Sequence, residues 1–176
     1  MKKRALFLDR DGIINVDHGY VYKIESFEFS EGIFDLIKLF TDAGYIIFIV
    51  TNQSGIGRGY YSEEDFTTLT NWMIEKFNDK NIKIEAVYHC PHSPEEKCHC
   101  RKPETGMIEQ ALKEYDIDLK HSWMIGDKSS DLALAHNANI GNSVYIGEKE
   151  SSKATFSFSV LSGAESYFQE NKGKIL

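Results

Sequence analysis

Two aspartates, one residue apart, follow a short apolar run near the start of the chain. Residues 5–8 have the length and composition of a buried strand, and Asp9 and Asp11 come directly after it. Because side chains alternate sides along an extended chain, Asp9 and Asp11 should project the same way. Paired carboxylates repel one another, and Mg²⁺, which prefers hard oxygen ligands, would offset that repulsion. The alternative is that Asp11 only begins a turn.

A second pair of aspartates follows another predicted strand. Asp127 comes after the run 121–126, and Asp131 lies four residues later, in the first turn of a predicted helix. These two residues could simply cap that helix and interact with its dipole. A shared Mg²⁺ is the better explanation, because it accounts for Asp9 and Asp11 as well.

Small polar residues and glycines follow the apolar run 45–50. Thr51, Asn52, Gln53 and Ser54 precede a segment with three glycines and Arg58. Glycines let backbone N–H groups approach an anion closely, and an arginine can bind a phosphate with two hydrogen bonds. The spacing matches neither a Walker A loop nor the dinucleotide-binding pattern, so an ordinary glycine-rich connection is the alternative.

All three cysteines lie in one polar loop, residues 89–102. The potential ligands form two close pairs separated by five residues: Cys90, His92, Cys98 and Cys100. Tetrahedral Zn²⁺ takes such a set, and four protein ligands would make the site structural. His89 and His99 are rival ligands that the spacing does not exclude, and free thiols are the alternative.

Two cations, Arg101 and Lys102, follow the cysteine loop immediately. A zinc-bound loop would fix both beside the carboxylates, where Lys102 could neutralise a phosphoryl group and Arg101 could bind a second one. A solvated basic pair is the alternative.

Hydrophobic periodicity predicts a single α/β domain over residues 1–176. Apolar runs predict strands at 5–8, 45–50, 82–88, 121–126, 143–146 and 155–160, and helical spacing predicts helices at 31–43, 62–79, 104–115, 129–138 and 162–171. This alternation is typical of a three-layer, doubly wound, mainly parallel sheet. Such sheets bind ligands at the carboxyl ends of their strands, where the candidate residues fall.

Composition excludes several partners. A net charge of −7 argues against nucleic acid and anionic membranes. No run of 18 apolar residues predicts a membrane span, and the basic start of the chain precedes an apolar run too short for a signal peptide. We therefore expect a cytoplasmic monomer that acts on a small molecule.

Taken together, these residues resemble the haloacid dehalogenase (HAD) superfamily of phosphatases. The motif residues occur in the family's order: Asp9, Asp11, Thr51, Lys102, Asp127 and Asp131. The segments 9–12, 15–20 and 51–55 and the cysteine loop with 100–103 resemble more closely the heptose-bisphosphate phosphatases, in the subgroup that also contains histidinol-phosphate phosphatase. The resemblance implies a HAD-like Rossmannoid fold. It also implies removal of the C7 phosphate of a D-glycero-D-manno-heptose 1,7-bisphosphate, in the biosynthesis of nucleotide-activated heptoses.

The resemblance also implies roles for individual residues. Asp9 would form an aspartyl-phosphate, and Asp11 would act as general acid and then general base. Mg²⁺ would be held by Asp9, the backbone carbonyl of Asp11 and Asp127, with Asp131 orienting a bound water. Thr51 and Lys102 would hold the phosphoryl oxygens. The substrate-binding set would be Asp17, His18, Gly19, Tyr20, Asn52, Gln53, Ser54, Arg58, Arg101 and Lys128.

The segments 13–30 and 52–62 are too short for the large cap domain of many HAD proteins, so loops alone should enclose the substrate. Two alternatives stay open. One is histidinol phosphate as substrate; the other is a zinc-stabilised interaction module without catalysis, which would leave the four aspartates unexplained.

Overall fold

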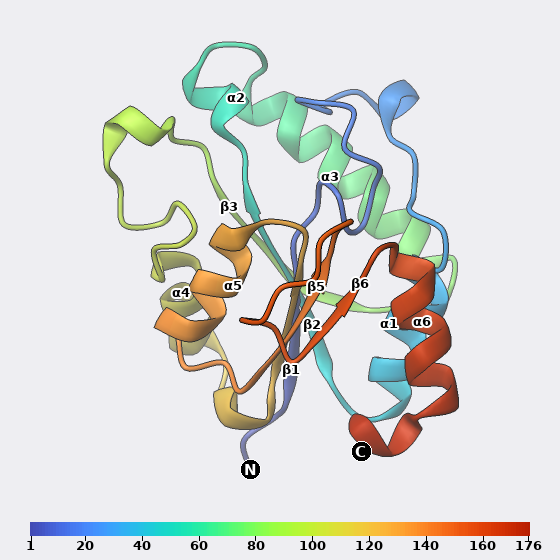
Figure 1. The fold of residues 1–176 in the computed structure, drawn as a ribbon. Coiled ribbons are helices and arrows are strands. Elements are labelled where there is room, and N and C mark those ends of the chain that lie inside the picture. Colours follow the sequence, from blue (N-terminus) through green and yellow to red (C-terminus); the bar gives the residue numbers. More distant parts are fainter.

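Six strands form one sheet in the computed structural model, which describes residues 1–176 (Figure 1). The strands are β1 (Ala5–Leu8), β2 (Ile46–Asn52), β3 (Ile84–Cys90), β4 (Trp123–Gly126), β5 (Asn142–Ile146) and β6 (Phe156–Phe158). Their order is β3-β2-β1-β4-β5-β6, and every neighbouring pair is parallel. The predicted α/β fold is confirmed, and the sheet is parallel throughout.

Helices cover both faces of the sheet and make three layers. They are α1 (Ile33–Asp42), α2 (Ser54–Gly57), α3 (Glu63–Asn78), α4 (Gly106–Glu114), α5 (Ser129–Asn137) and α6 (Leu161–Glu170). The larger core cluster joins one face of the sheet to α1, α3 and α6, and a smaller cluster joins the other face to α4 and α5 (Figure 1). None of these helices is both long enough and apolar enough to cross a bilayer.

The central strand β1 has all four residues buried and contributes to both cores, because its side chains alternate between the two faces. It lies between β2 and β4, so the strand order reverses direction beside it. In doubly wound sheets a ligand crevice forms at such a reversal, outside the carboxyl ends of the strands. Asp9, Thr51 and Asp127 therefore come to one edge of the sheet.

One connection differs from the sequence expectation, because the glycine-rich segment after β2 contains the one-turn helix α2. Residues 13–30 contain a short 3₁₀ turn (Ile24–Ser26) and isolated bridges. In contrast, α3 begins as predicted. Ser62 caps the helix by accepting from the Asp65 N–H at 3.0 Å, and the Asp65 carboxylate accepts from the Ser62 N–H at 2.8 Å.

Candidate active site

A buried charged cluster stands where β1 and β4 end. Asp9, Asp127 and Asp131 each bring one carboxylate oxygen to within 4.8 Å of the others. Nζ of Lys102 lies 2.8 Å from Oδ1 of Asp9 and 2.7 Å from Oδ1 of Asp131, and it also donates to the carbonyl of Val50 at 2.9 Å. The buried Lys102 ammonium therefore pairs with two of the three carboxylates, and the cluster holds more negative than positive charge.

The pKa shifts in the cluster indicate that its carboxylates lack positive charge to balance them. Burial raises the pKa of Asp9 to about 8, against the opposing effect of Lys102, and the neighbouring carboxylates raise it further. Burial also raises the pKa of Asp127, whose Oδ1 has no hydrogen-bond partner and lies 4.0 Å from the Lys128 ammonium. A divalent ion would supply the missing charge, and the oxygen donors are the type that Mg²⁺ prefers.

Asp131 combines the two roles that the sequence left open. Its Oδ2 accepts from the backbone N–H of Lys128 at 3.1 Å, which caps the start of α5. Its Oδ1 pairs with Lys102, so the same side chain belongs to the charged cluster. Capping and cluster formation are therefore compatible, because a carboxylate offers two separate oxygens.

Gly12 makes room for Asp127. Its φ is +90°, and a Cβ at this position would lie 2.0 Å from Oδ2 of Asp127. We expect Gly12→Ala to displace that carboxylate and lower kcat/KM at least tenfold. The left-handed backbone should also cost about 1–2 kcal/mol of stability. Gly44→Ala is the matched control, since its φ is +88° with no atom within 4 Å. Equal activity of the two variants, measured beside their Tm values, would contradict this role.

The carboxylate of Asp11 lies outside the cluster. The chain turns immediately after β1, where the N–H groups of residues 13, 14 and 15 all donate to the carbonyl of Arg10. The extended backbone that would place Asp9 and Asp11 in one patch therefore ends too early. Oδ1 of Asp11 accepts from the Arg10 guanidinium at 2.8 Å and from Asn15 at 3.0 Å, and Oδ2 accepts from Gln53 at 3.0 Å.

An open cleft of about 290 Å³ adjoins Asp11. Most of the expected substrate-binding residues line it, on segments from four parts of the chain. These are Asp17, Gly19, Tyr20, Asn52, Gln53, Ser54, Arg101 and Lys128. Lys128 and Asp17 face each other with 3.6 Å between the ammonium and a carboxylate oxygen. The loop after β1 therefore contributes to this cleft, as the sequence suggested.

Two expected substrate-binding residues do not line the cleft. His18 is exposed, and its Nε2 lies 3.0 Å from a carboxylate oxygen of Glu28. Arg58 is exposed at the end of α2, one turn beyond Ser54. The spacing alone did not reveal that residues 54–57 form a helical turn. This turn separates Arg58 from the polar residues before it.

Three residues of the site escaped the sequence analysis. Tyr61 and Ser130 line the cleft, and Arg10, with 1% of its surface exposed, binds Asp11. No spacing rule marks Tyr61, which looks like an apolar residue before a helix cap. Alternation along a strand would point Arg10 away from the two aspartates, but the turn after β1 removes that constraint. Ser130, two residues from Lys128, was identifiable only as a polar residue in a helix's first turn.

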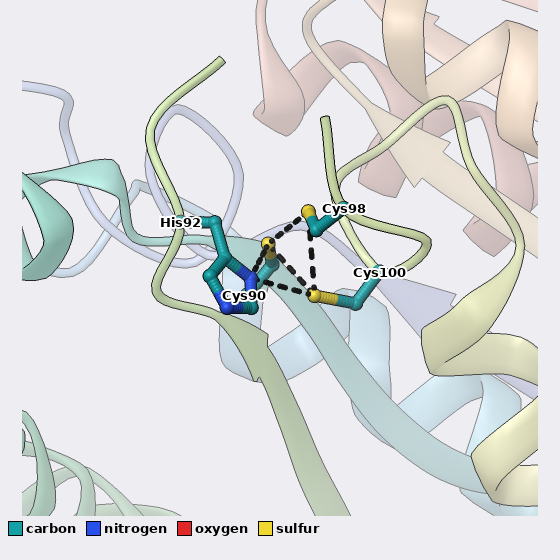
Figure 2. Close-up of side chains that lie close together, drawn as sticks. All are labelled: Cys90, His92, Cys98 and Cys100. Atoms are coloured by element: carbon teal, nitrogen blue, oxygen red, sulfur yellow. Dashed lines mark hydrogen bonds between the residues drawn. The ribbon is translucent and has the colours of Figure 1, made fainter. Parts of the chain in front are cut away.

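A second cluster gathers the four expected metal ligands of the cysteine loop (Figure 2). Nδ1 of His92 lies 3.2 Å from Sγ of Cys100 and 3.5 Å from Sγ of Cys90. The three sulfur atoms lie 2.9–3.7 Å from one another. These separations exceed the roughly 2.05 Å of a disulfide and approach the spacing of about 3.8 Å that four sulfurs around one Zn²⁺ would adopt.

The rival histidines point elsewhere. His89 stacks on Phe66, with 4.1 Å between ring centroids, and its Nε2 lies 2.7 Å from Glu63. His99 is exposed and lies 3.0 Å from both carboxylate oxygens of Glu109. Of the three candidate histidines, His92 is the one that clusters with the cysteines in this structure.

The cysteine cluster is directly connected to the charged cluster. Sγ of Cys98 accepts from the backbone N–H of Arg101 at 3.3 Å. The next residue, Lys102, is held by Asn52, whose side chain accepts from the Lys102 N–H at 2.9 Å and donates to the Lys102 carbonyl at 3.3 Å. The loop therefore sets the position of the two cations, and the Asn52 amide is occupied by this contact.

The comparisons with known proteins agree on the family of the relatives. A family model described as HAD-hydrolase-like matches residues 99–152. A D-glycero-alpha-D-manno-heptose-1,7-bisphosphate 7-phosphatase from Campylobacter jejuni is 52% identical over 150 residues, covering 85% of this chain and 86% of the relative. The D-glycero-beta-D-manno-heptose-1,7-bisphosphate 7-phosphatase of Helicobacter pylori is 49% identical over 144 residues, covering 81% and 83%.

Two solved structures share the fold over nearly the whole chain. A putative HAD-like phosphatase from Mesorhizobium loti superposes with a TM-score of 0.84 at 27% identity, covering 99% of this chain and 86% of that one. The D,D-heptose 1,7-bisphosphate phosphatase from B. bronchiseptica, complexed with magnesium and phosphate, gives a TM-score of 0.80 at 24% identity and covers 96% and 99%.

Proposed function

The chain belongs to the heptose-1,7-bisphosphate 7-phosphatases, a family of HAD-like hydrolases, and we propose from this premise that it removes the C7 phosphate of D-glycero-D-manno-heptose 1,7-bisphosphate in nucleotide-activated heptose biosynthesis. The observation that carries the proposal is the arrangement of charges. The cluster of Asp9, Asp127 and Asp131 adjoins a cleft in which Arg101 and Lys128 supply further positive charge. One end of the cleft suits the reacting phosphate, and the other suits a second phosphate.

Asp9 is the proposed nucleophile. Both hydrogen bonds to its carboxylate, from Lys102 and from the backbone N–H of Arg10 at 2.8 Å, reach Oδ1. Oδ2 is therefore the oxygen that attacks phosphorus, forming an O–P bond as the bond from phosphorus to the C7 oxygen breaks. Thr51 and Lys102 hold the phosphoryl oxygens in this proposal, because Lys102 contacts Asp9 and Thr51 is buried near the end of β2, the strand next to β1.

Asp11 is the proposed general acid and base. It gives its proton to the departing sugar oxygen, and then takes a proton from the water that hydrolyses the aspartyl-phosphate. Inorganic phosphate leaves, and both aspartates return to their starting states. Asp9, Asp127 and the carbonyl of Asp11 would hold Mg²⁺, with Asp131 orienting a bound water. When bound, the ion offsets charge between nucleophile and phosphate.

We propose that the cysteine cluster holds Zn²⁺ in a structural role. Three thiol groups and one imidazole form a closed set of four ligands, which leaves no coordination position for substrate. The contact from Cys98 to Arg101 then gives the ion a function at a distance, since it fixes the cations that face the substrate.

We also propose that the enzyme acts as a cytoplasmic monomer. Its proposed substrate is a doubly phosphorylated sugar, and the negative charge of such a sugar keeps it inside a cell.

A phosphate-release assay on a small panel tests the proposed function. The panel contains both anomers of the heptose bisphosphate, because relatives named for each anomer match the chain, together with heptose 7-phosphate and histidinol phosphate. We expect preference for a bisphosphate. Arg101→Gln should raise KM for the bisphosphate about tenfold and change KM for the monophosphate little, since it removes one contact to the second phosphate. A clear preference for histidinol phosphate would overturn the assignment.

A further inference from the structure

The side chain of Gln53 is fully used inside the protein. Its Nε2 donates to Oδ2 of Asp11 at 3.0 Å and to Oγ1 of Thr51 at 2.8 Å, and its Oε1 accepts from the hydroxyl of Tyr61. Only 2% of Gln53 is exposed. A sugar hydroxyl could bond to this amide only by breaking one of these contacts, so the substrate-binding role expected from the sequence is poorly supported by the geometry.

The three partners determine which way the amide points. The carbonyl oxygen of Gln53 accepts from the hydroxyl of Tyr61, which leaves the NH₂ group to donate to the Asp11 carboxylate and to Thr51. Burial raises the pKa of Tyr61 to about 12, so its hydroxyl keeps the proton that it donates. The Tyr61 ring is confined as well, because it stacks on Tyr22 with 5.1 Å between centroids and packs against the backbone of Gly55.

We propose that Gln53 is a positioning residue for Asp11, and that Tyr61 fixes the amide of Gln53 in the orientation that this requires. Arg10 and Asn15 hold one oxygen of Asp11, and only Gln53 among side chains holds the other. The carboxylate plane is therefore set by donors on both sides, while 17% of the side chain remains exposed to the cleft. This inference rests on the proposed function, because it assumes that Asp11 protonates a sugar oxygen.

Substrates with different leaving groups distinguish a residue that positions the general acid from a residue that only supports the fold. A sugar alkoxide needs a proton as it departs, whereas p-nitrophenolate leaves without one at neutral pH. The parameter kcat/KM covers only the steps up to leaving-group departure, so the later role of Asp11 as a base does not enter. Loss of Asp11 positioning should therefore lower kcat/KM for the heptose bisphosphate far more than for p-nitrophenyl phosphate.

The experiment measures kcat/KM for the heptose bisphosphate divided by kcat/KM for p-nitrophenyl phosphate. This ratio is compared among wild type, Gln53→Met, Tyr61→Phe and Tyr22→Phe. Gln53→Met keeps the side-chain length without a donor, and we expect the ratio to fall about 30-fold. Tyr61→Phe removes only the hydroxyl that orients the amide, with an expected fall of about fivefold. Tyr22→Phe is the matched control, because it removes a hydroxyl from the ring stacked on Tyr61 but does not line the cleft, and the ratio should not change.

The outcomes are distinct. An unchanged ratio in Gln53→Met, including an equal loss on both substrates, would overturn the positioning role, because Thr51 or the fold would then be what Gln53 supports. If Gln53→Met fails to fold, the ratio in Tyr61→Phe decides in the same way. A wild-type protein that hydrolyses p-nitrophenyl phosphate but not the sugar bisphosphate would instead refute the proposed function.

Discussion

Asp9→Asn should lower kcat by about 10⁴-fold or more while the protein stays folded, since replacing a covalent nucleophile removes the reaction path itself. The fold should tolerate the change because asparagine has the size of aspartate and removes one of three carboxylates whose burial and mutual repulsion raise the pKa of Asp9. Asparagine retains an oxygen for the Lys102 ammonium, whose second carboxylate partner, Asp131, is unaffected.

Two measurements test this result together. Acid-quenched turnover of substrate labelled in the C7 phosphate should leave label on wild-type protein and none on Asp9→Asn. The Tm of the variant without added magnesium should lie within a few degrees of wild type. Labelled Asp9→Asn protein, or a variant with more than a tenth of wild-type kcat, would show that another group takes up phosphorus.

Cys98→Ser should destabilise the protein by at least about 3 kcal/mol, because it opens a four-ligand site in a loop with little apolar content. For a chain of this size that corresponds to a fall in Tm of about 6–12 °C or more. Activity should fall too, since the Cys98 sulfur accepts from the backbone N–H of Arg101, next to Lys102.

The neighbouring His99 supplies the matched control. His99→Gln loses only exposed contacts to Glu104 and Glu109, which should change Tm by less than about 2 °C. Elemental analysis of wild type should return about one zinc per chain. If protein stripped by a chelator proves as stable and as active as the metal-loaded form, the structural role is wrong.

Periodicity was enough to predict the α/β architecture because the neighbouring strands β1 and β2 carry continuous apolar runs and helical spacing separates the strands that follow. The start of the helix predicted over 62–79 was correct because a capping box, which depends on residues three positions apart, forms there between Ser62 and Asp65. The charged cluster followed from one rule, that parallel strands present their carboxyl ends at one edge. These features depend on local sequence or on a general property of parallel sheets.

What sequence missed depends on contacts between distant segments. The separation of Asp11 from Asp9 comes from a turn whose N–H groups share the Arg10 carbonyl. The contact between Tyr61 and Gln53 requires α2 to bring residues 53 and 61 face to face. Neither has a pattern in the printed sequence, because turn geometry and side-chain pairing are set by packing. Contacts with distant residues likewise hold the other two histidines away from the cysteines. His89 contacts Glu63 and Phe66, and His99 contacts Glu109.

The central position of β1 has a consequence for how the protein is made. β1 leaves the ribosome well before its neighbour β4, which is complete only at Gly126, and Asp127 follows β4. At the roughly 5–20 residues per second of translation, the 118 residues that separate Asp9 from Asp127 take about 6–24 s to synthesise. During that interval one edge of the nascent β1 is unpaired, so chaperone capture of partial chains should decline sharply once β4 has emerged.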